Sequence, residues 1–159
     1  MRYTNAQASA LVFLRLAIGW HFLYEGGVKV LNPNWTSKAY LLDSGGFMKG
    51  FFELIANNPL YLNITDTANA WGLTLIGLSL ISGVFTRYSS ISAIVLLSLY
   101  YLSHPAFPGI EYYFPSDGSY FIINKTLVEI FALFVLFAFP TSLVFGILRL
   151  VKNKKTNWV

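Results

Sequence analysis

The first long apolar stretch of this sequence carries four ionisable side chains, Arg15, His21, Glu25 and Lys29. In a helix, which turns by about 100° per residue, all four fall within one arc of about 120°. An ionised side chain costs about 2.5–3.5 kcal/mol near the centre of a membrane-spanning helix, so such residues mark functional sites by default. The pattern predicts a polar cavity that opens outward and binds a polar head group or an anion.

A second charged pair occurs in the last apolar stretch, where Lys125 and Glu129 are four residues apart and share one helical face. The chain runs outward in the first stretch and inward in the last. Both charged sets therefore lie in the outer halves of their helices. By depth, Glu25 is expected near Glu129 and Lys29 near Lys125, and diagonal Glu–Lys pairs would neutralise the set. The alternative is purely structural: paired charges that fix which helices touch.

Four apolar segments are candidates to position these residues, because about 20 residues span a hydrocarbon core near 30 Å. They cover residues 8–31, 67–84, 88–104 and 122–150. Charged residues make up 11% of the 159 residues and aromatic residues 18%, which is too little polar surface for a small soluble domain. We therefore predict an all-α fold: a single integral membrane domain over residues 1–159, built as a four-helix bundle.

Basic residues decide the expected orientation. They gather at the N-terminus, at Arg87 between the second and third segments, and in the tail that contains Lys152, Lys154 and Lys155. The positive-inside rule then places both termini in the cytoplasm. The tail also accounts for the net charge of +4, so no nucleic-acid partner is needed.

The two outer loops differ in what they predict. In the long first loop, residues 32–66, the side chains Phe47, Phe51, Leu54 and Ile55 recur at helical spacing, which predicts a short amphipathic helix on the bilayer surface. The last loop, residues 103–121, is rich in proline and aromatic residues. It is expected to sit in the membrane–water interface or to form a lid over the bundle.

The sequence argues against several cofactors. The chain has no cysteine, which excludes disulfides, dithiol chemistry and iron–sulfur clusters held by this chain. His21 and His104 are its two histidines, too few for a trusted haem pair. We find no metal-binding or flavin-binding motif, so no metal site is expected.

Four short motifs occur in a defined order along the chain. They are Arg15, Gly19, Gly26 and Lys29 in the first segment; Gly77, Gly83 and Arg87 at the end of the second; His104-Pro105 after the third; and Asn124-Lys125 with Glu129 at the start of the last. In order and spacing they resemble the DoxX/DoxD family of small membrane proteins.

The resemblance implies a four-helix membrane bundle associated with a membrane oxidoreductase. The long first loop is closer to the DoxD branch, which is a subunit of thiosulfate:quinone oxidoreductase and works with a partner protein. The expected substrate is then a quinone or a small anion such as thiosulfate. The expected place is the bacterial or archaeal plasma membrane.

Site roles follow from this resemblance together with side-chain chemistry. Glu25, Glu129 and His21 are the candidates to relay protons as catalytic groups. The candidates to bind a quinone oxygen or an anion are Arg15, Lys29, Lys125 and His104. Because His104-Pro105 stands at a helix end, a capping role for His104 is equally open. The alternative function is non-catalytic: a membrane scaffold, or a transporter that binds a small solute or lipid.

Overall fold

The structure, a computed structural model, describes residues 3–113, 121–139, 141 and 146. Within these ranges the fold is all-helical, with no β-strand, as the composition and periodicity predict. The long helices are α1 (Asn5–Leu31), α4 (Pro59–Ser82), α5 (Thr86–Ser103) and α6 (Lys125–Ala138). Two short helices, α2 (Lys38–Leu42) and α3 (Lys49–Asn57), lie between α1 and α4, with a 3-10 turn over Gly46–Met48.

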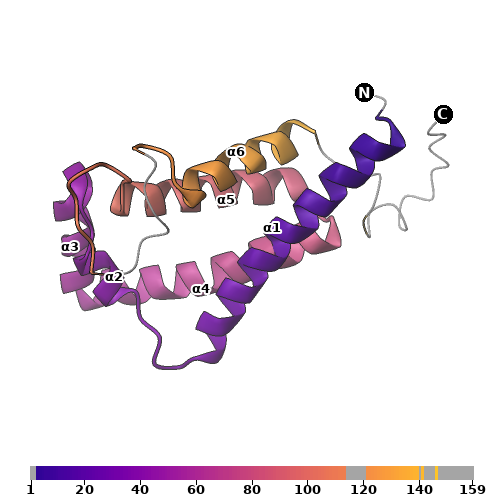
Figure 1. Cartoon of the computed structure of the whole chain (residues 1–159). Coiled ribbons are helices and arrows are strands. Elements are labelled where there is room, and N and C mark those ends of the chain that lie inside the picture. Colours follow the sequence, from indigo (N-terminus) through magenta and orange to yellow (C-terminus); the bar gives the residue numbers. More distant parts are fainter. Residues whose placement is uncertain (1–2, 114–120, 140, 142–145, 147–159) are drawn as a thin grey trace.

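The long helices pack as two pairs around one core. Helix α1 packs most extensively on α4, helix α5 packs on α6, and α4 joins the pairs through α5 (Figure 1). The core takes at least one fully buried apolar side chain from each helix: Phe22, Leu80, Ala93 and Leu133. Helices α2 and α3 cover one end of this arrangement and bury their own small cluster around Leu41 and Phe52.

Glycines bring α1 and α4 into backbone contact. A Cβ atom added to Gly26 would lie 2.4 Å from the backbone nitrogen of Thr74, and one added to Gly77 would lie 2.4 Å from that of Leu23. Neither position has room for a side chain. The two helix backbones therefore approach closely, as they do where small residues line the contact between membrane helices. Gly27, by contrast, has open space around its missing Cβ.

Two helix starts differ from the predicted segment boundaries. Helix α4 begins at Pro59, not near residue 67, because Asn58 caps it: the Asn58 Oδ1 accepts from the Leu60 nitrogen at 3.0 Å, and proline is favourable at the first helical position. Helix α6 begins at Lys125, not at residue 122, because Asn124 caps it in the same way through the nitrogen of Leu127 at 3.0 Å. The rest of the predicted 122–150 segment lies, beyond Phe139, mostly outside the described residues.

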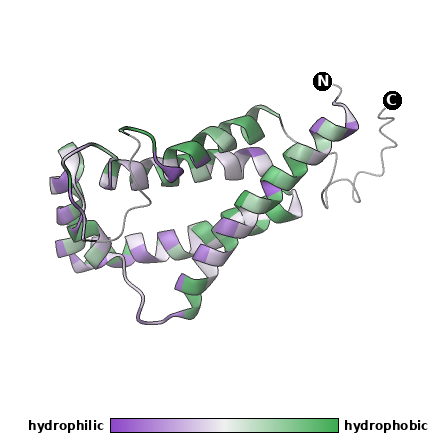
Figure 2. Ribbon diagram, viewed as in Figure 1, coloured by the Kyte–Doolittle hydropathy of each residue, from purple (hydrophilic) through white to green (hydrophobic). Residues whose placement is uncertain are grey.

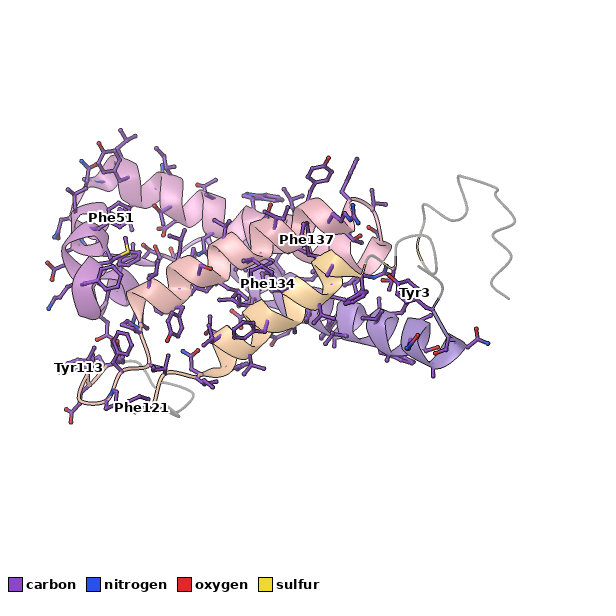
Figure 3. The ribbon with its side chains drawn as sticks, turned by 90° about the horizontal axis from the view of Figure 1, so that it is seen from above. Tyr3, Phe51, Tyr113, Phe121, Phe134 and Phe137 are labelled. Carbon is purple, nitrogen blue, oxygen red and sulfur yellow. The ribbon has the colours of Figure 1, made fainter. Side chains whose placement is uncertain are left out.

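Apolar side chains cover much of the outer surface. Among the described residues, α1 is the one helix that is long and apolar enough, by length and composition, to cross a membrane. It exposes Phe13 and Leu31 by 72% and 83%, which would be costly in water and suits lipid. Figure 2 shows hydrophilic residues concentrated around α3 and hydrophobic residues along α6. In Figure 3, Phe134 and Phe137 lie on α6 and Phe51 on α3, at the other end of the molecule.

Candidate functional site

The charged face of α1 lies against neighbouring helices in its C-terminal half. The Lys29 ammonium donates a hydrogen bond to Oδ1 of Asn69 on α4 at 3.1 Å, and its Nζ lies 3.8 Å from the Glu25 carboxylate one turn earlier. The same ammonium lies 5.1 Å from the ring centre of Trp35 and 5.8 Å from that of Tyr100. Lys29 is thus held by a polar amide and two aromatic faces as well as by an acid.

A hydrogen-bonded pair joins α1 to α6. The Nδ1 of His21 lies 2.8 Å from Oε1 of Glu129, a distance at which an imidazole N–H donates to a carboxylate. The side chain of Glu129 is 12% exposed and that of His21 39% exposed. Such a pair can hold a proton on either partner and pass it to a third group placed beside them.

These residues line one cavity of about 170 Å³ between the four long helices. Its acidic, basic and imidazole side chains come from α1 and α6: His21, Glu25, Lys29, Lys125 and Glu129. Its other wall residues, from all four helices, are Phe22, Leu73, Leu97, Tyr100 and Thr126. The cavity therefore combines acids, cations and an imidazole on one side with an apolar wall on the other, as ligand sites generally do.

The pairing within the cavity differs from the depth-based expectation. Among the described residues, Glu129 pairs with His21 across the helices, and Lys29 pairs with Glu25 within α1. The expected diagonal bridges between Glu and Lys of the two helices do not form within 4 Å in the described part. The reason is the relative height of α1 and α6, which puts His21, one turn below Glu25, opposite Glu129.

Arg15 lies apart from this cavity. It is 1% exposed on α1, and its Nη1 donates to the Thr141 hydroxyl oxygen at 3.1 Å. The structure thus places this predicted ligand-binding residue at a contact between α1 and Thr141, and not on the wall of this cavity.

His104 also lies outside the cavity, in an aromatic cluster at the end of α5. Its ring stacks on Tyr40 with centroids 4.0 Å apart, and its Nε2 lies 3.5 Å from Oδ2 of Asp43. The Tyr112 ring also packs against His104, with ring centroids 4.7 Å apart, and the Tyr112 hydroxyl donates to the Pro105 carbonyl at 2.9 Å. Burial raises the pKa of Tyr40 to about 12, so its phenol is neutral at physiological pH. His104 is part of the packing that closes this end of the molecule.

One residue that the sequence reasoning missed is Tyr100. It lines the cavity, and its hydroxyl accepts a hydrogen bond from Nδ2 of Asn69 at 2.6 Å. Its spacing in the sequence indicates this position, because Ala93, Leu97 and Tyr100 recur at helical spacing along the inward face of α5. Asn69 is the group that connects Lys29 to Tyr100.

The charges of the cavity can perform two kinds of chemistry. The ammonium groups can donate hydrogen bonds to a carbonyl oxygen or an anion, and the His21–Glu129 pair can exchange a proton. Among the described residues, no group of three or more His, Cys, Asp or Glu side chains is placed to hold a metal ion.

Comparison with protein families decides the relationship. The DoxX family model matches residues 10–105, more than half of the chain. The chain belongs to the DoxX family. This match runs from α1 to the end of α5 and so includes His21, Glu25, Lys29 and Tyr100, whereas Lys125 and Glu129 of α6 lie beyond it. DoxX is a membrane family, so this chain is a membrane protein in contact with lipid. No curated protein and no solved structure matches the chain.

Proposed function

We propose that this DoxX protein is the membrane subunit of a quinone-linked oxidoreductase, and that the charged cavity binds the quinone head group. The observation that carries the proposal is the His21–Glu129 pair, 2.8 Å apart across α1 and α6, with the Lys29 ammonium on the same cavity wall. DoxX proteins are often associated with quinone oxidoreductases, which supports this choice.

The chemistry fits the residues present. A quinone that becomes a quinol takes up two electrons and two protons. The His21–Glu129 pair transfers protons to a carbonyl oxygen, and Glu25, whose side chain is 49% exposed, returns protons to the pair. Lys29 and Lys125 donate hydrogen bonds to the oxygens as negative charge develops on them. The electrons come from a partner subunit, with thiosulfate as the proposed donor.

The size of the cavity is consistent with a head group. A cavity of about 150 Å³ holds a single benzene ring, and this one measures about 170 Å³. It is smaller than the roughly 300–1,000 Å³ of sites that enclose a whole drug-sized molecule. The ring of a quinone or a small anion fits such a space, and a long tail does not.

We further propose that all four long helices cross the bacterial or archaeal plasma membrane, with both termini in the cytoplasm. Helices α1, α4 and α5, of 27, 24 and 18 residues, are about 40, 36 and 27 Å long at 1.5 Å per residue, against a hydrocarbon core near 30 Å. Helix α6, of 14 residues, is about 21 Å long, and its place in the bilayer rests on its packing against α5 and its exposed apolar side chains. Exposed apolar side chains such as Leu75 on α4, Val95 on α5 and Phe131 on α6 support this placement.

The second candidate function is a non-catalytic scaffold, or a carrier for a small solute or lipid. One observation favours it: the polar groups of the cavity already satisfy one another, through His21–Glu129 and Lys29–Asn69–Tyr100. A network of this kind is also what a purely structural connection between helices requires.

Quinone binding separates the two functions. The protein is purified, its lipids are extracted for quinone, and thiosulfate-dependent quinone reduction is followed optically with candidate partner subunits. We expect quinone to copurify. We also expect Lys29→Gln to weaken binding by about tenfold, the value of a charged hydrogen bond. The matched control is Lys49→Gln on the exposed face of α3, which should bind as the unaltered protein does. If no quinone copurifies and no partner supports reduction, the scaffold or carrier function remains.

A further inference from the structure

A second cavity, of about 290 Å³, lies between α3, α4 and α5 beneath α2. Unlike the charged cavity, its walls are mainly aliphatic and aromatic. They include Leu41 of α2, Phe52 and Ile55 of α3, and Leu96, Leu99 and Tyr100 of α5. We call this space the apolar groove. It carries none of the ionisable residues that define the charged cavity.

Tyr100 connects the two spaces, because its side chain lines both of them. Asn69 lines the apolar groove, donates to the Tyr100 hydroxyl at 2.6 Å and accepts from the Lys29 ammonium at 3.1 Å. The Tyr100 ring, held by the Asn69 amide, is therefore a wall that the polar and the apolar space share. A molecule with a polar end and an apolar chain would meet this ring where its two parts join.

The groove opens at the surface of the molecule. Three of its wall residues, Phe51, Ile64 and Leu99, are 51%, 58% and 41% exposed and come from three different helices. Phe51 belongs to α3, at the end of the molecule away from Phe137 (Figure 3). An apolar chain can enter from the bilayer through such an opening without crossing water.

Size decides what occupies the groove. If the charged cavity of about 170 Å³ holds a quinone ring, the isoprenoid tail must lie elsewhere. The apolar groove shares the Tyr100 wall, is larger, and exposes mainly apolar surface to its interior, although Ser37, Thr65 and Ser103 also line it. We propose that the apolar groove binds the first isoprenoid units of a quinone whose ring lies in the charged cavity. This inference rests on the proposed function and assigns its ligand to a long-tailed, lipid-soluble quinone.

The test compares quinones that share a ring and differ in the tail. Binding of a tailless benzoquinone and of its decyl derivative is measured on the purified protein by displacement or calorimetry. Burial of apolar carbon favours binding by about 0.8 kcal/mol per methylene, so even two buried methylenes give about a tenfold preference. We expect the decyl compound to bind at least about tenfold more tightly.

A groove-filling variant locates the tail. Ala68 lies on the groove wall with an exposed position on α4, so Ala68→Phe fills the groove without forcing a side chain into the core. We expect it to remove the preference for the decyl compound and to leave binding of the tailless compound unchanged. The matched control is Ala10→Phe, the same substitution at an exposed position of α1 away from both spaces.

The outcomes separate this inference from the function on which it rests. If both compounds bind equally to the unaltered protein, the tail site is wrong and the quinone function stands. The tail site is also wrong if Ala68→Phe keeps the full preference for the decyl compound. If that variant does not fold, the comparison of the two compounds on the unaltered protein decides, and the absence of a preference there shows that the tail site is wrong. If neither compound binds, the proposed quinone function and the proposed tail site are both wrong. The tail site would also be wrong if phospholipid chains copurify and the decyl compound does not displace them.

Discussion

The carboxylate of Glu129 is 12% exposed and receives its hydrogen bond from His21, a residue 108 positions earlier in the chain. This geometry gives a group that can hold a proton next to an apolar wall. Lys29 has a different role, because Asn69 and two aromatic rings fix its ammonium in addition to the nearby acid. At this scale the charges form two separate units, one suited to proton transfer and one suited to hydrogen bonding with an oxygen.

Substitution of Glu129 distinguishes a proton-transfer group from a structural one. We expect Glu129→Gln to retain a hydrogen bond to His21 and to fold normally, but to lose quinone reduction. Glu129→Ala leaves the half-buried imidazole without its partner and should cost about 1–3 kcal/mol of stability. Thermal unfolding in detergent and turnover are measured for both.

The control for this prediction is Glu53→Ala, which breaks the exposed Lys49–Glu53 pair on α3. It should change stability by less than about 1 kcal/mol. Full turnover in Glu129→Gln would contradict a proton-transfer role, even if Glu129→Ala proves unstable.

Among the helices, the α1–α4 contact is the tightest, and glycines set it. Gly26 lies against the backbone of Thr74, and Gly77 lies against that of Leu23. The two contacts come from different helices and fix both the separation of the pair and its crossing. The position of His21 and Lys29 in the cavity follows from this crossing, because both residues are on the same helix as Gly26.

A pair of neighbouring glycines tests the importance of this contact. Gly26→Ala puts a methyl group 2.4 Å from the Thr74 nitrogen and must push the helices apart, at a cost of about 1–3 kcal/mol. Gly27→Ala has open space and should be neutral or stabilise the helix by up to about 1 kcal/mol. Thermal unfolding measures both, and equal effects would show that α1 and α4 are not in close contact.

Across the whole molecule, the short helices and the termini of the long helices lie at opposite ends. Helices α2 and α3 and the His104 cluster close one end, while the Asn5 end of α1 and the Ala138 end of α6 lie at the other (Figure 1). The turn from Ser82 to Thr86 also lies away from α3, because it joins the far ends of α4 and α5. With cytoplasmic termini, the end that carries α3 faces outward.

Single-cysteine labelling tests this orientation without interference, because the chain has no cysteine. Lys49→Cys on exposed α3 should react with a membrane-impermeant maleimide added to intact cells. Tyr88→Cys, which is exposed at the start of α5, should react only after the membrane is permeabilised. Reaction of both positions from outside would contradict the proposed crossing of α4.

Much of the local structure was accessible from the sequence, and its failures have identifiable causes. Hydropathy places the third segment close to α5, but it misses the first two turns of α4, because Asn63 and Asp66 lower the hydropathy there while Asn58 and Pro59 start the helix. The shared face of His21, Glu25 and Lys29 follows from helical period. Periodicity gives the rotation of a helix about its axis and says little about where it starts.

The sequence by itself determined the family, the all-helical fold and the two helices that carry the charges. Tertiary structure decided which charge meets which. Helical period fixes the direction of a side chain around its axis, whereas the height and tilt of α1 depend on the close contacts of Gly26 and Gly77. Those contacts put His21, and not Lys29, opposite Glu129. They leave Arg15 outside the cavity, and the packing of α5 places Tyr100 between the charged cavity and the apolar groove.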